Sequence, residues 1–373
     1  MDLLLTGARV LTPAEAPAGA WVAVSGSRIE AVGDGAPPAA AETVDLSGRL
    51  LVPGFLDLHV HGGGGAHFMS GDPRDCARAA RFHARHGTTG LLATTLSAPA
   101  AELVAAVRAI AHADDPVILG AHLEGPWLSE QRRGVQEAEH LRPPDPGELA
   151  ALLAAGPVRL VSLAPELPGA LAAIEAIAAA GAVPGLAHTD ATYEQATAAI
   201  EAGARHAVHV FNGMRPLHHR EPGVIGAVLD HAAVTCELIA DGIHVHPAAA
   251  RLLRRAKGPG GTVLITDAIE ATGLEDGDYQ LGRTPIRVSG GRAETAEGYL
   301  AGSTLTMDAA VRNAHAWFGV PLAETLAMAT TTPARVIGLA HRKGRIASGY
   351  DADLAVLDEA LRPVATFVAG RRV

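Results

Sequence analysis

Short apolar runs alternate with longer alanine-rich stretches between residues 53 and 338. The apolar runs read as buried strands, and the stretches between them have the length and composition of helices. Because strands that alternate with helices form a parallel sheet covered by helices, eight such units predict an α/β fold, a (β/α)₈ TIM barrel. The eight expected strands are Phe55–His59, Thr89–Thr94, Val117–Leu123, Leu160–Ala164, Val183–Ala187, Ala207–Val210, Thr235–Ala240 and Val263–Thr266. Examples of the expected helices are Arg74–Arg85, Ala100–Ala113, Pro168–Ala180 and Thr192–Ala202.

Both ends of the chain have a different sequence pattern, in which short β-like runs are separated by glycines and charged turns. The N-terminal runs are Leu3–Thr6, Val22–Val24, Arg28–Val32 and Thr43–Asp45. The C-terminal runs are Gly344–Ile346, Asp353–Leu357 and Ala365–Val368. We expect these two ends to combine into one small β domain made of residues 1–52 and 339–373, beside a catalytic barrel of residues 53–338.

An open, doubly wound sheet is the competing architecture. Its dinucleotide signature is a G-x-G-x-x-G turn after the first strand, with an acidic residue about 20 positions later. Gly62–Gly65 lies near that place, but the spacing and the acidic residue are missing. The barrel is therefore the favoured fold.

Composition and charge narrow the class of protein. Hydrophobic residues make up 48% of the chain and charged residues 19%, which excludes a disordered chain. A net charge of −10 argues against a nucleic-acid partner, since such proteins neutralise phosphates with basic surfaces. Two cysteines, Cys76 and Cys236, are typical of a reducing compartment. No signal-like start or long apolar run occurs, so we expect a cytoplasmic protein without a membrane partner.

Candidate metal ligands stand where the expected strands end, which is the face that carries barrel active sites. In His59-Val60-His61 both imidazoles point the same way, because side chains alternate along a strand. On that motif alone, structural or solvent-facing histidines are an equal alternative. Other strands end in His122-Leu123-Glu124, His188, His209 and Asp267, and only a closed barrel brings all of these residues together. Imidazole and carboxylate are ligands that borderline divalent metals prefer.

The chain has 18 histidines, so some have no part in a metal site. Several fall on expected helices or at their edges, and for these we expect surface or packing roles. They are His83, His86, His112, His140, His206, His231 and His315.

Nearly end to end, the sequence resembles the amidohydrolase superfamily and, within it, the family of N-acetylglucosamine-6-phosphate deacetylases. The resemblance rests on a combination of motifs along the chain. They are Pro53–Gly62, His122–Pro126, His188 with Ala191-Thr192-Tyr193, His209–Met214, Arg220–Gly223, Asp241–His244, Thr266–Ala268, Ala301–Ser303 with Thr306-Met307-Asp308, and Gly344–Leu354. The last motif is similar to the return of the chain into the superfamily's small β-sandwich, which we therefore expect the two chain ends to form.

The resemblance implies a divalent metal centre. By position, Glu124, His188 and His209 are the ligands of the principal site, and His59 and His61 would supply a second, more variable one. Zinc is the expected ion, with one or two bound per subunit, although iron, manganese or cobalt suit the same ligands. Relatives such as dihydroorotases use a carboxylated lysine instead, and no lysine stands at this strand end.

The resemblance also implies roles in catalysis and substrate binding. Asp267 would be the general base that takes a proton from a metal-activated water, where the alternative is a helix N-cap. Arg220 and His244 would bind the substrate phosphate, with Asn212 and the Gly213 backbone nearby. In the family that arginine reaches into the neighbouring subunit, which implies a homodimer; taken alone, Arg220 is a surface charge.

One position departs from the family pattern. The loop after the third strand usually carries a histidine that polarises the substrate carbonyl, and this chain has Gln136 there. A glutamine amide donates a hydrogen bond but carries no charge. We therefore expect Gln136 to contact the substrate in catalysis and binding, and the enzyme's catalytic efficiency to differ from that of relatives with a histidine. Asp57 is a candidate for orienting a metal-binding histidine, with a fold role as the alternative.

The resemblance implies a metal-dependent hydrolase that converts N-acetyl-D-glucosamine 6-phosphate into D-glucosamine 6-phosphate and acetate, in amino-sugar catabolism or cell-wall recycling. One alternative is an amidohydrolase that deacylates another N-acyl amino sugar or amine. The other is a catalytically inactive paralogue that binds a ligand.

Overall fold

The barrel is built from eight parallel strands that follow one another in chain order around the sheet. The computed structural model describes residues 1–11 and 20–373. A parallel bridge between Val60 and Ala268, with the Asp267 amide donating to the His59 carbonyl at 2.9 Å, joins the first strand to the end of the last. The strands are β7 (Phe55–Val60), β10 (Thr88–Thr94), β11 (Ile118–Glu124), β12 (Val158–Leu163), β13 (Val183–Leu186), β14 (His206–Ala207), β15 (Thr235–Ile239) and β16 (Thr262–Ile265).

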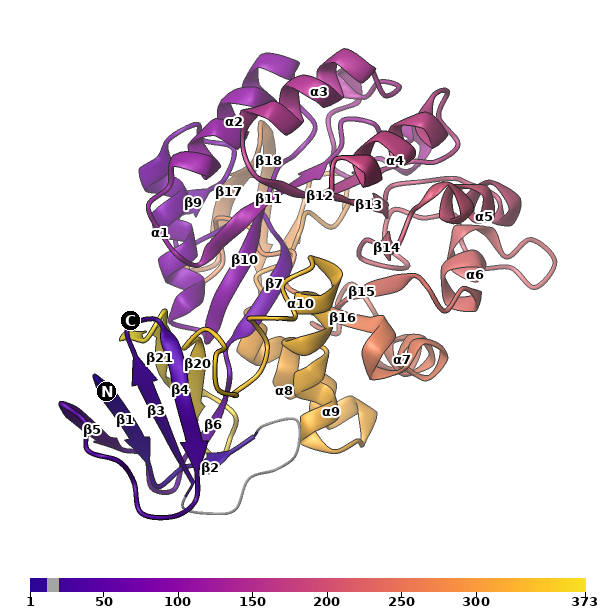
Figure 1. Ribbon diagram of the computed structural model, residues 1–373. Helices are drawn as coiled ribbons and strands as arrows, with labels where there is room; N and C mark the ends of the chain where they lie inside the picture. The colour runs from indigo at the N-terminus through magenta and orange to yellow at the C-terminus, as the bar shows by residue number, and fades with distance from the viewer. Residues whose placement is uncertain (12–19) are drawn as a thin grey trace.

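Helices surround this sheet, as Figure 1 shows. They are α1 (Pro73–Ala84), α2 (Ala100–His112), α3 (Pro146–Ala155), α4 (Ala170–Ala179), α5 (Tyr193–Ala202), α6 (Gly223–Asp230), α7 (Pro247–Gly261), α8 (Met307–Phe318), α9 (Leu322–Ala327) and α10 (Thr331–Val336). Local sequence sets several of their starts: the Asp72 carboxylate caps α1, and Thr192 with Gln195 forms a capping box on α5. Short 3₁₀ turns lie at Glu130–Arg132 and Ala138–His140. No helix in the described ranges has the length and apolar character that a membrane crossing requires.

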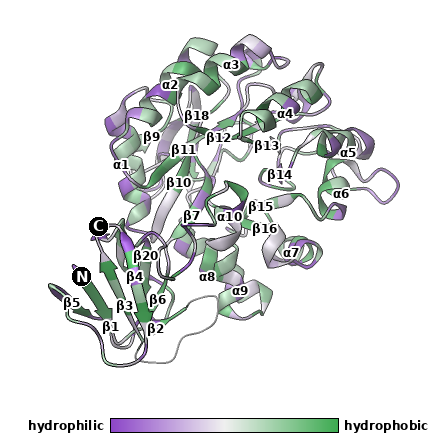
Figure 2. Ribbon diagram, in the orientation of Figure 1, coloured by the Kyte–Doolittle hydropathy of each residue, from purple (hydrophilic) through white to green (hydrophobic). Residues whose placement is uncertain are grey.

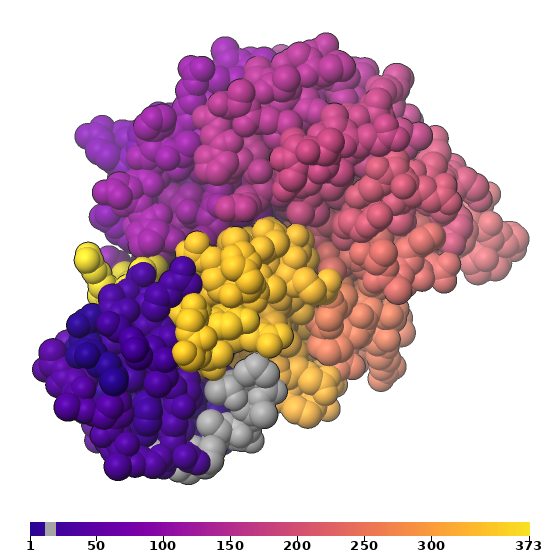
Figure 3. All heavy atoms as spheres, in the orientation of Figure 1, coloured from indigo at the N-terminus to yellow at the C-terminus, as the bar shows by residue number. Residues whose placement is uncertain are grey.

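The two chain ends form a β-sandwich beside the barrel. One sheet has the order β4 (Arg28–Gly33), β3 (Trp21–Ser25), β1 (Leu3–Thr6) and β5 (Glu42–Asp45). The other has the order β2 (Arg9–Val10), β6 (Leu50–Pro53), β20 (Leu354–Leu357), β21 (Pro363–Val368) and β22 (Arg371–Arg372). Apolar side chains from both sheets share one core, and strands β1, β3 and β6 are coloured as hydrophobic in Figure 2. Figure 3 shows the N- and C-terminal segments in contact. The predicted fold class, a TIM barrel with a small β-sandwich, is confirmed.

Three details of the strands differ from the prediction. Ala207–Val210 was expected as the sixth strand, but the strand ends at Ala207 because His209 turns into a left-handed conformation, with φ of 30°. Residues Gly344–Ile346 form turns rather than a strand, since Gly344 has φ of 83° and packs so closely on Thr330 that a Cβ would lie 2.7 Å from that residue's carbonyl oxygen.

The third difference is a small antiparallel sheet inserted between β16 and α8, which the sequence reading missed. Its strands are β17 (Gly277–Leu281), β18 (Thr284–Ser289) and β19 (Arg292–Glu294). It has a separate small core around Leu281, Ile286 and Val288. The alternation of exposed and buried residues in β18, followed by Gly290-Gly291, is the signal that identifies such a hairpin. Two-residue strands β8 (Gly62–Gly63) and β9 (Ala66–His67) also pair after β7.

A buried ion cluster fixes the return of the chain into the sandwich. The Lys343 ammonium lies 3.1 Å from an Asp351 carboxylate oxygen and also binds Asp353, and all three side chains are buried. Arg342 binds the same Asp351 carboxylate from a more exposed position. Lys343 is therefore the buried counter-ion of two carboxylates.

We expect Lys343→Met to destabilise the fold by about 3–5 kcal/mol, because it leaves buried carboxylate charge without its partner. Urea denaturation of the purified protein measures this loss. Arg342→Ala is the matched control, and removing its exposed side chain should cost less than about 1 kcal/mol. An equal decrease in the free energy of unfolding of the two variants would show that burial of the ion pair does not increase its contribution to stability.

Candidate active site

Polar side chains from the ends of several barrel strands meet in a cavity of about 250 Å³. The cavity opens at the carboxyl ends of the strands, the face on which barrel active sites are built. Its lining includes nearly all of the residues predicted from strand ends and loops, namely His61, Glu124, Gln136, His188, His209, Asn212, Gly213, His244 and Asp267. His59 lies directly beneath them and is fully buried.

Glu124, His188 and His209 form the tightest group. The Nε2 atoms of His209 and His188 lie 2.9 and 3.2 Å from Glu124 Oε1, and 3.1 Å from each other. All three residues are buried, and together they offer three ligand atoms around one point. This geometry can hold one cation.

Hydrogen bonding fixes the orientation of the His188 ring. Its Nδ1 lies 2.8 Å from the carbonyl oxygen of Arg132, which can only accept, so Nδ1 carries the proton and Nε2 of the neutral ring carries a lone pair. That lone pair faces Glu124 and the His209 ring. Metal-binding histidines are held in the same way, by a hydrogen bond from the other ring nitrogen.

His59, His61 and Asp267 extend the site toward β7. The Nε2 atoms of the two histidines are 3.2 Å apart, and they lie 3.5 and 3.3 Å from Asp267 Oδ1. His61 is also 3.4 Å from Glu124 Oε2, so Glu124 faces both halves of the site. The structure thus brings together all five predicted metal ligands and the predicted general base.

The buried carboxylates give the site a strong preference for positive charge. Burial by itself would lower the pKa of His59, but the facing carboxylates of Glu124, Glu237 and Asp267 raise that pKa to about 10. Burial opposes ionisation of Asp267, yet His59 and His61 outweigh it and hold the Asp267 pKa below its usual range. Buried charges of one sign need a counter-ion, and a divalent metal satisfies these ligands.

Glu237 lies at the base of the site and was missed by the sequence reading. This fully buried residue of β15 has one oxygen, Oε2, 3.1 Å from His59 Nδ1 and 3.0 Å from the backbone N–H of His209. Its other oxygen is 2.9 Å from His206 Nε2. One carboxylate therefore positions a residue from each half of the site. The sequence did contain a signal for this residue, because a glutamate within a largely apolar strand is seldom buried unless it has a partner.

Asp57 is a second buried carboxylate beneath the site. It accepts hydrogen bonds from the Thr266 hydroxyl at 2.5 Å and from the backbone N–H of His59 at 3.3 Å. Burial raises its pKa to about 7, against the lowering effect of the Thr266 hydrogen bond. Asp57 thus binds the backbone of His59 and does not contact its ring.

Three of the site residues adopt a backbone conformation that side chains other than glycine rarely occupy. The φ angles of His188, His209 and Asp267 are 41°, 30° and 53°. Such conformations cost of order 1–3 kcal/mol each and persist only where the surrounding structure holds them. Here the strained positions are the ends of strands, where the chain must turn an imidazole or carboxylate into the cavity.

Gln136 contacts the metal-binding group. Its amide nitrogen donates to Glu124 Oε2 at 2.9 Å, and its oxygen accepts from the Ser97 backbone N–H at 2.8 Å. The side chain is buried and lines the cavity. It is therefore held against Glu124 by two hydrogen bonds.

The predicted phosphate-binding residues are divided between two places. Asn212, Gly213 and His244 line the cavity, and His244 is fixed by its Nδ1 contact of 2.6 Å to Asp241. Arg220 is exposed, contacts His219 at 2.9 Å and does not line this cavity. A single chain thus does not bring Arg220 to its own site.

The histidines expected to have no part in the metal site lie outside the cavity lining. The expectation for one of them, His206, was wrong in its position. His206 was expected at a helix edge, but it is a buried residue of β14 and a partner of Glu237. His83 is buried and contacts the Gly62 carbonyl at 2.8 Å. His122 is buried beside His59, with ring centroids 4.7 Å apart, and contacts Ser162.

Comparison with known proteins agrees with this site. A model of the amidohydrolase family matches residues 50–373. The chain therefore belongs to the amidohydrolase family. Within it, the chain is 41% identical to an N-acetylglucosamine-6-phosphate deacetylase of Vibrio furnissii over 340 residues, which cover 89% of this chain and 85% of that protein.

Two other relatives bear on the substrate. An N-acetylgalactosamine-6-phosphate deacetylase of Escherichia coli O157:H7 is 40% identical over 341 residues, covering 90% of each chain. A mutant N-acetyl-D-glucosamine-6-phosphate deacetylase from Mycobacterium smegmatis, solved in complex with N-acetyl-D-glucosamine-6-phosphate, is 43% identical. It superimposes with a TM-score of 0.94 over 99% of this chain and 98% of that one. The predicted family resemblance is confirmed.

We expect Glu237→Gln to weaken metal binding about 10- to 100-fold, because a neutral amide no longer holds the His59 ring and the His209 backbone as the carboxylate does. Competition with a chromogenic chelator measures the affinity, and thermal melting of the metal-free protein measures the fold. Glu201→Gln, on an exposed face of α5, is the control. Unchanged metal affinity in Glu237→Gln would contradict a positioning role.

Proposed function

We propose that this chain is a deacetylase that hydrolyses N-acetyl-D-glucosamine 6-phosphate to D-glucosamine 6-phosphate and acetate. The observation that carries the proposal is the convergence of Glu124, His188 and His209 beside an ionised Asp267, in a chain of this family. The M. smegmatis enzyme in complex with this sugar phosphate is 43% identical across the full barrel and sandwich.

Glu124, His188 and His209 would hold the principal divalent ion, and His59 with His61 would hold a second one. When bound, such a metal acidifies a water molecule and polarises a carbonyl group. We propose zinc, since its preferred ligands are imidazole nitrogen and carboxylate oxygen. The buried donors fit this ion: the facing Nε2 atoms of His188 and His209 are 3.1 Å apart, where a cation would satisfy both lone pairs.

Asp267 would move the proton in the reaction. Its carboxylate is ionised near neutral pH and lines the cavity, so it accepts a proton from the attacking water as that water adds to the amide carbon. The same carboxyl group then donates the proton to the departing nitrogen as the C–N bond breaks. Gln136 holds Glu124 in place and presents its amide to the same cavity.

The phosphate of the substrate would lie at the far side of the cavity, near Asn212, Gly213 and His244. We propose that the chain works as a homodimer in which Arg220 of one subunit completes this phosphate site in the other. Its exposure and its absence from the lining of its own cavity favour that arrangement. An arginine fork binds phosphate oxygens in pairs, which suits this task.

N-acetylgalactosamine 6-phosphate is a second candidate substrate, favoured by the E. coli relative at 40% identity. The two sugars differ only in the orientation of one ring hydroxyl, so kcat/KM on both decides between them. The inactive-paralogue alternative is disfavoured, because the chain retains the complete donor set and Asp267.

The proposed setting is the cytoplasm, since both cysteines are free and buried. We also propose that the domains divide as the sequence suggests, with residues 1–52 and 339–373 in the sandwich and 53–338 in the barrel. Strand β6 lies at the first boundary and pairs with β20 in the sandwich.

Asp267→Asn should keep its metal and fold while kcat falls about 10²- to 10⁴-fold, because the variant cannot accept the proton. Acetate release measures turnover, and elemental analysis measures the metal. Asp278→Asn, on the exposed inserted sheet, is the control and should retain full activity. Near-normal kcat in Asp267→Asn would exclude the general-base role.

Arg220→Ala should lower kcat/KM for the 6-phosphate substrate about ten- to a hundred-fold, the equivalent of about 1.5–3 kcal/mol for a charge-assisted hydrogen bond. The unphosphorylated sugar should react as before. Arg74→Ala, at a side chain that is 91% exposed, is the control.

Mixing Arg220→Ala with Asp267→Asn tests the contact across the dimer. A hybrid dimer regains one intact site only if Arg220 serves the neighbouring subunit, so activity should return on mixing. If subunits exchange and activity stays flat, Arg220 does not act across an interface.

A further inference from the structure

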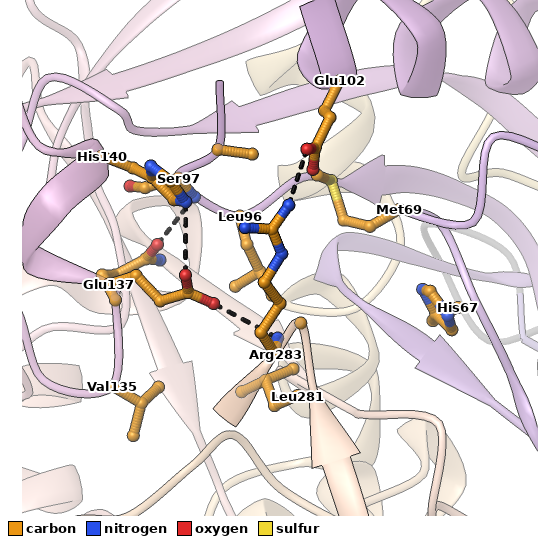
Figure 4. Close-up of a pocket in the computed structure, with 13 residues that line it drawn as sticks. His67, Met69, Leu96, Ser97, Glu102, Val135, Glu137, His140, Leu281 and Arg283 are labelled. Atoms are coloured by element: carbon orange, nitrogen blue, oxygen red, sulfur yellow. Dashed lines mark hydrogen bonds and ion pairs between the residues drawn. The ribbon is translucent and has the colours of Figure 1, made fainter. Parts of the chain in front are cut away.

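A second cavity, of about 200 Å³, adjoins the active site. Figure 4 shows its side chains, which come from β9 and the loop after it, from the loops after β10 and β11, from helix α2 and from the tip of the β17–β18 hairpin. This volume far exceeds the roughly 10–15 Å³ that one water needs, so the cavity can hold part of a ligand. Neither the family match nor the roles proposed above use it.

The two cavities share one wall. Leu96, Val135, Gln136 and Leu281 line both of them. The proposed phosphate contacts Asn212, Gly213 and His244 line the active-site cavity and are not part of the second one. The second cavity therefore borders the active site through these four shared residues and not through the proposed phosphate contacts.

The charged residues around the second cavity neutralise one another. Arg283 reaches across to Glu102 with an N–O distance of 2.7 Å, as the dashed line in Figure 4 shows. Glu137 lies 3.2 Å from His140 and also accepts the Arg283 backbone N–H at 3.2 Å. These charges are therefore largely paired with one another.

The rest of the lining has a polar part, His67, Ser97 and Gln136, and a larger apolar part. Met69, Leu96, Val135 and Leu281 supply aliphatic surface, and Leu96 and Val135 pack against the small core of the inserted sheet. Burial of apolar ligand surface against such walls is favourable at about 25 cal/mol per Å². An uncharged aliphatic group is thus the ligand that this cavity suits.

We propose that this cavity is an acyl subsite, which lets the enzyme hydrolyse amino-sugar 6-phosphates whose N-acyl chain has three or four carbons. The proposal rests on the proposed function. With the phosphate near His244 and the amide carbon beside Asp267, the acyl chain would extend toward Leu96 and Val135, which line both cavities. Water adds to the acyl carbon and the C–N bond breaks, so the products are the free amine and propionate or butyrate.

The test compares N-acetyl-, N-propionyl- and N-butyryl-glucosamine 6-phosphate as substrates. The parent should hydrolyse the butyryl substrate with kcat/KM within about tenfold of the acetyl value. Two variants at Met69, which lines the second cavity but not the active site, should act in opposite directions. Met69→Trp fills the cavity and should lower the butyryl-to-acetyl ratio at least tenfold, whereas Met69→Ala widens it and should raise that ratio.

The acetyl substrate is the internal control, since neither variant touches the reacting groups and its kcat/KM should stay within about twofold. If the parent releases acetate but no butyrate, or if Met69→Trp slows all three substrates equally, the acyl subsite is excluded. If the parent releases no acetate from either amino-sugar phosphate, the proposed function itself is wrong. The two failures are therefore distinguishable.

Discussion

Burial of negative charge at one end of the barrel is the constraint on which the rest of the site depends. The carboxylates of Glu124, Glu237 and Asp267 are all buried within a few ångströms of His59. Carboxylates are not stable in such a place without positive charge beside them. The carboxylates raise the pKa of His59 to about 10, so its ring supplies part of that positive charge. The neutral His188 ring, held by the Arg132 carbonyl, leaves a lone pair in the centre, where a bound cation would supply the rest.

The barrel makes this arrangement possible because closure brings distant segments to one edge. The hydrogen bond between the Asp267 amide and the His59 carbonyl closes the ring and places the first and last strands side by side. At the same edge the backbone of His188 and His209 is forced into left-handed conformations. The packed strands beneath hold that strain, and the side chains gain a fixed direction in return.

The barrel and most of the site residues were predictable from the sequence, because both depend on the order of the strands. Alternating apolar runs identify barrel strands, and His59, Glu124 and Asp267 stand directly at strand ends, where topology alone decides that they meet. Glu237 stands out as a charged residue in a buried strand, but its role was not predictable, because its partners His59, His206 and His209 come from two other parts of the chain. Gln136 was expected to contact the substrate, and its hydrogen bond to Glu124 depends on a loop conformation that no local pattern encodes.

The inserted sheet β17–β19 has its own small core, separate from the two large cores that hold the barrel. Its tip nevertheless supplies Leu281 to the walls of both cavities. Mutations in this sheet can therefore change which molecules fit while the ligands beneath keep their geometry. The shape of the cavity wall and the geometry of the buried ligands are thus set by different cores of the same molecule.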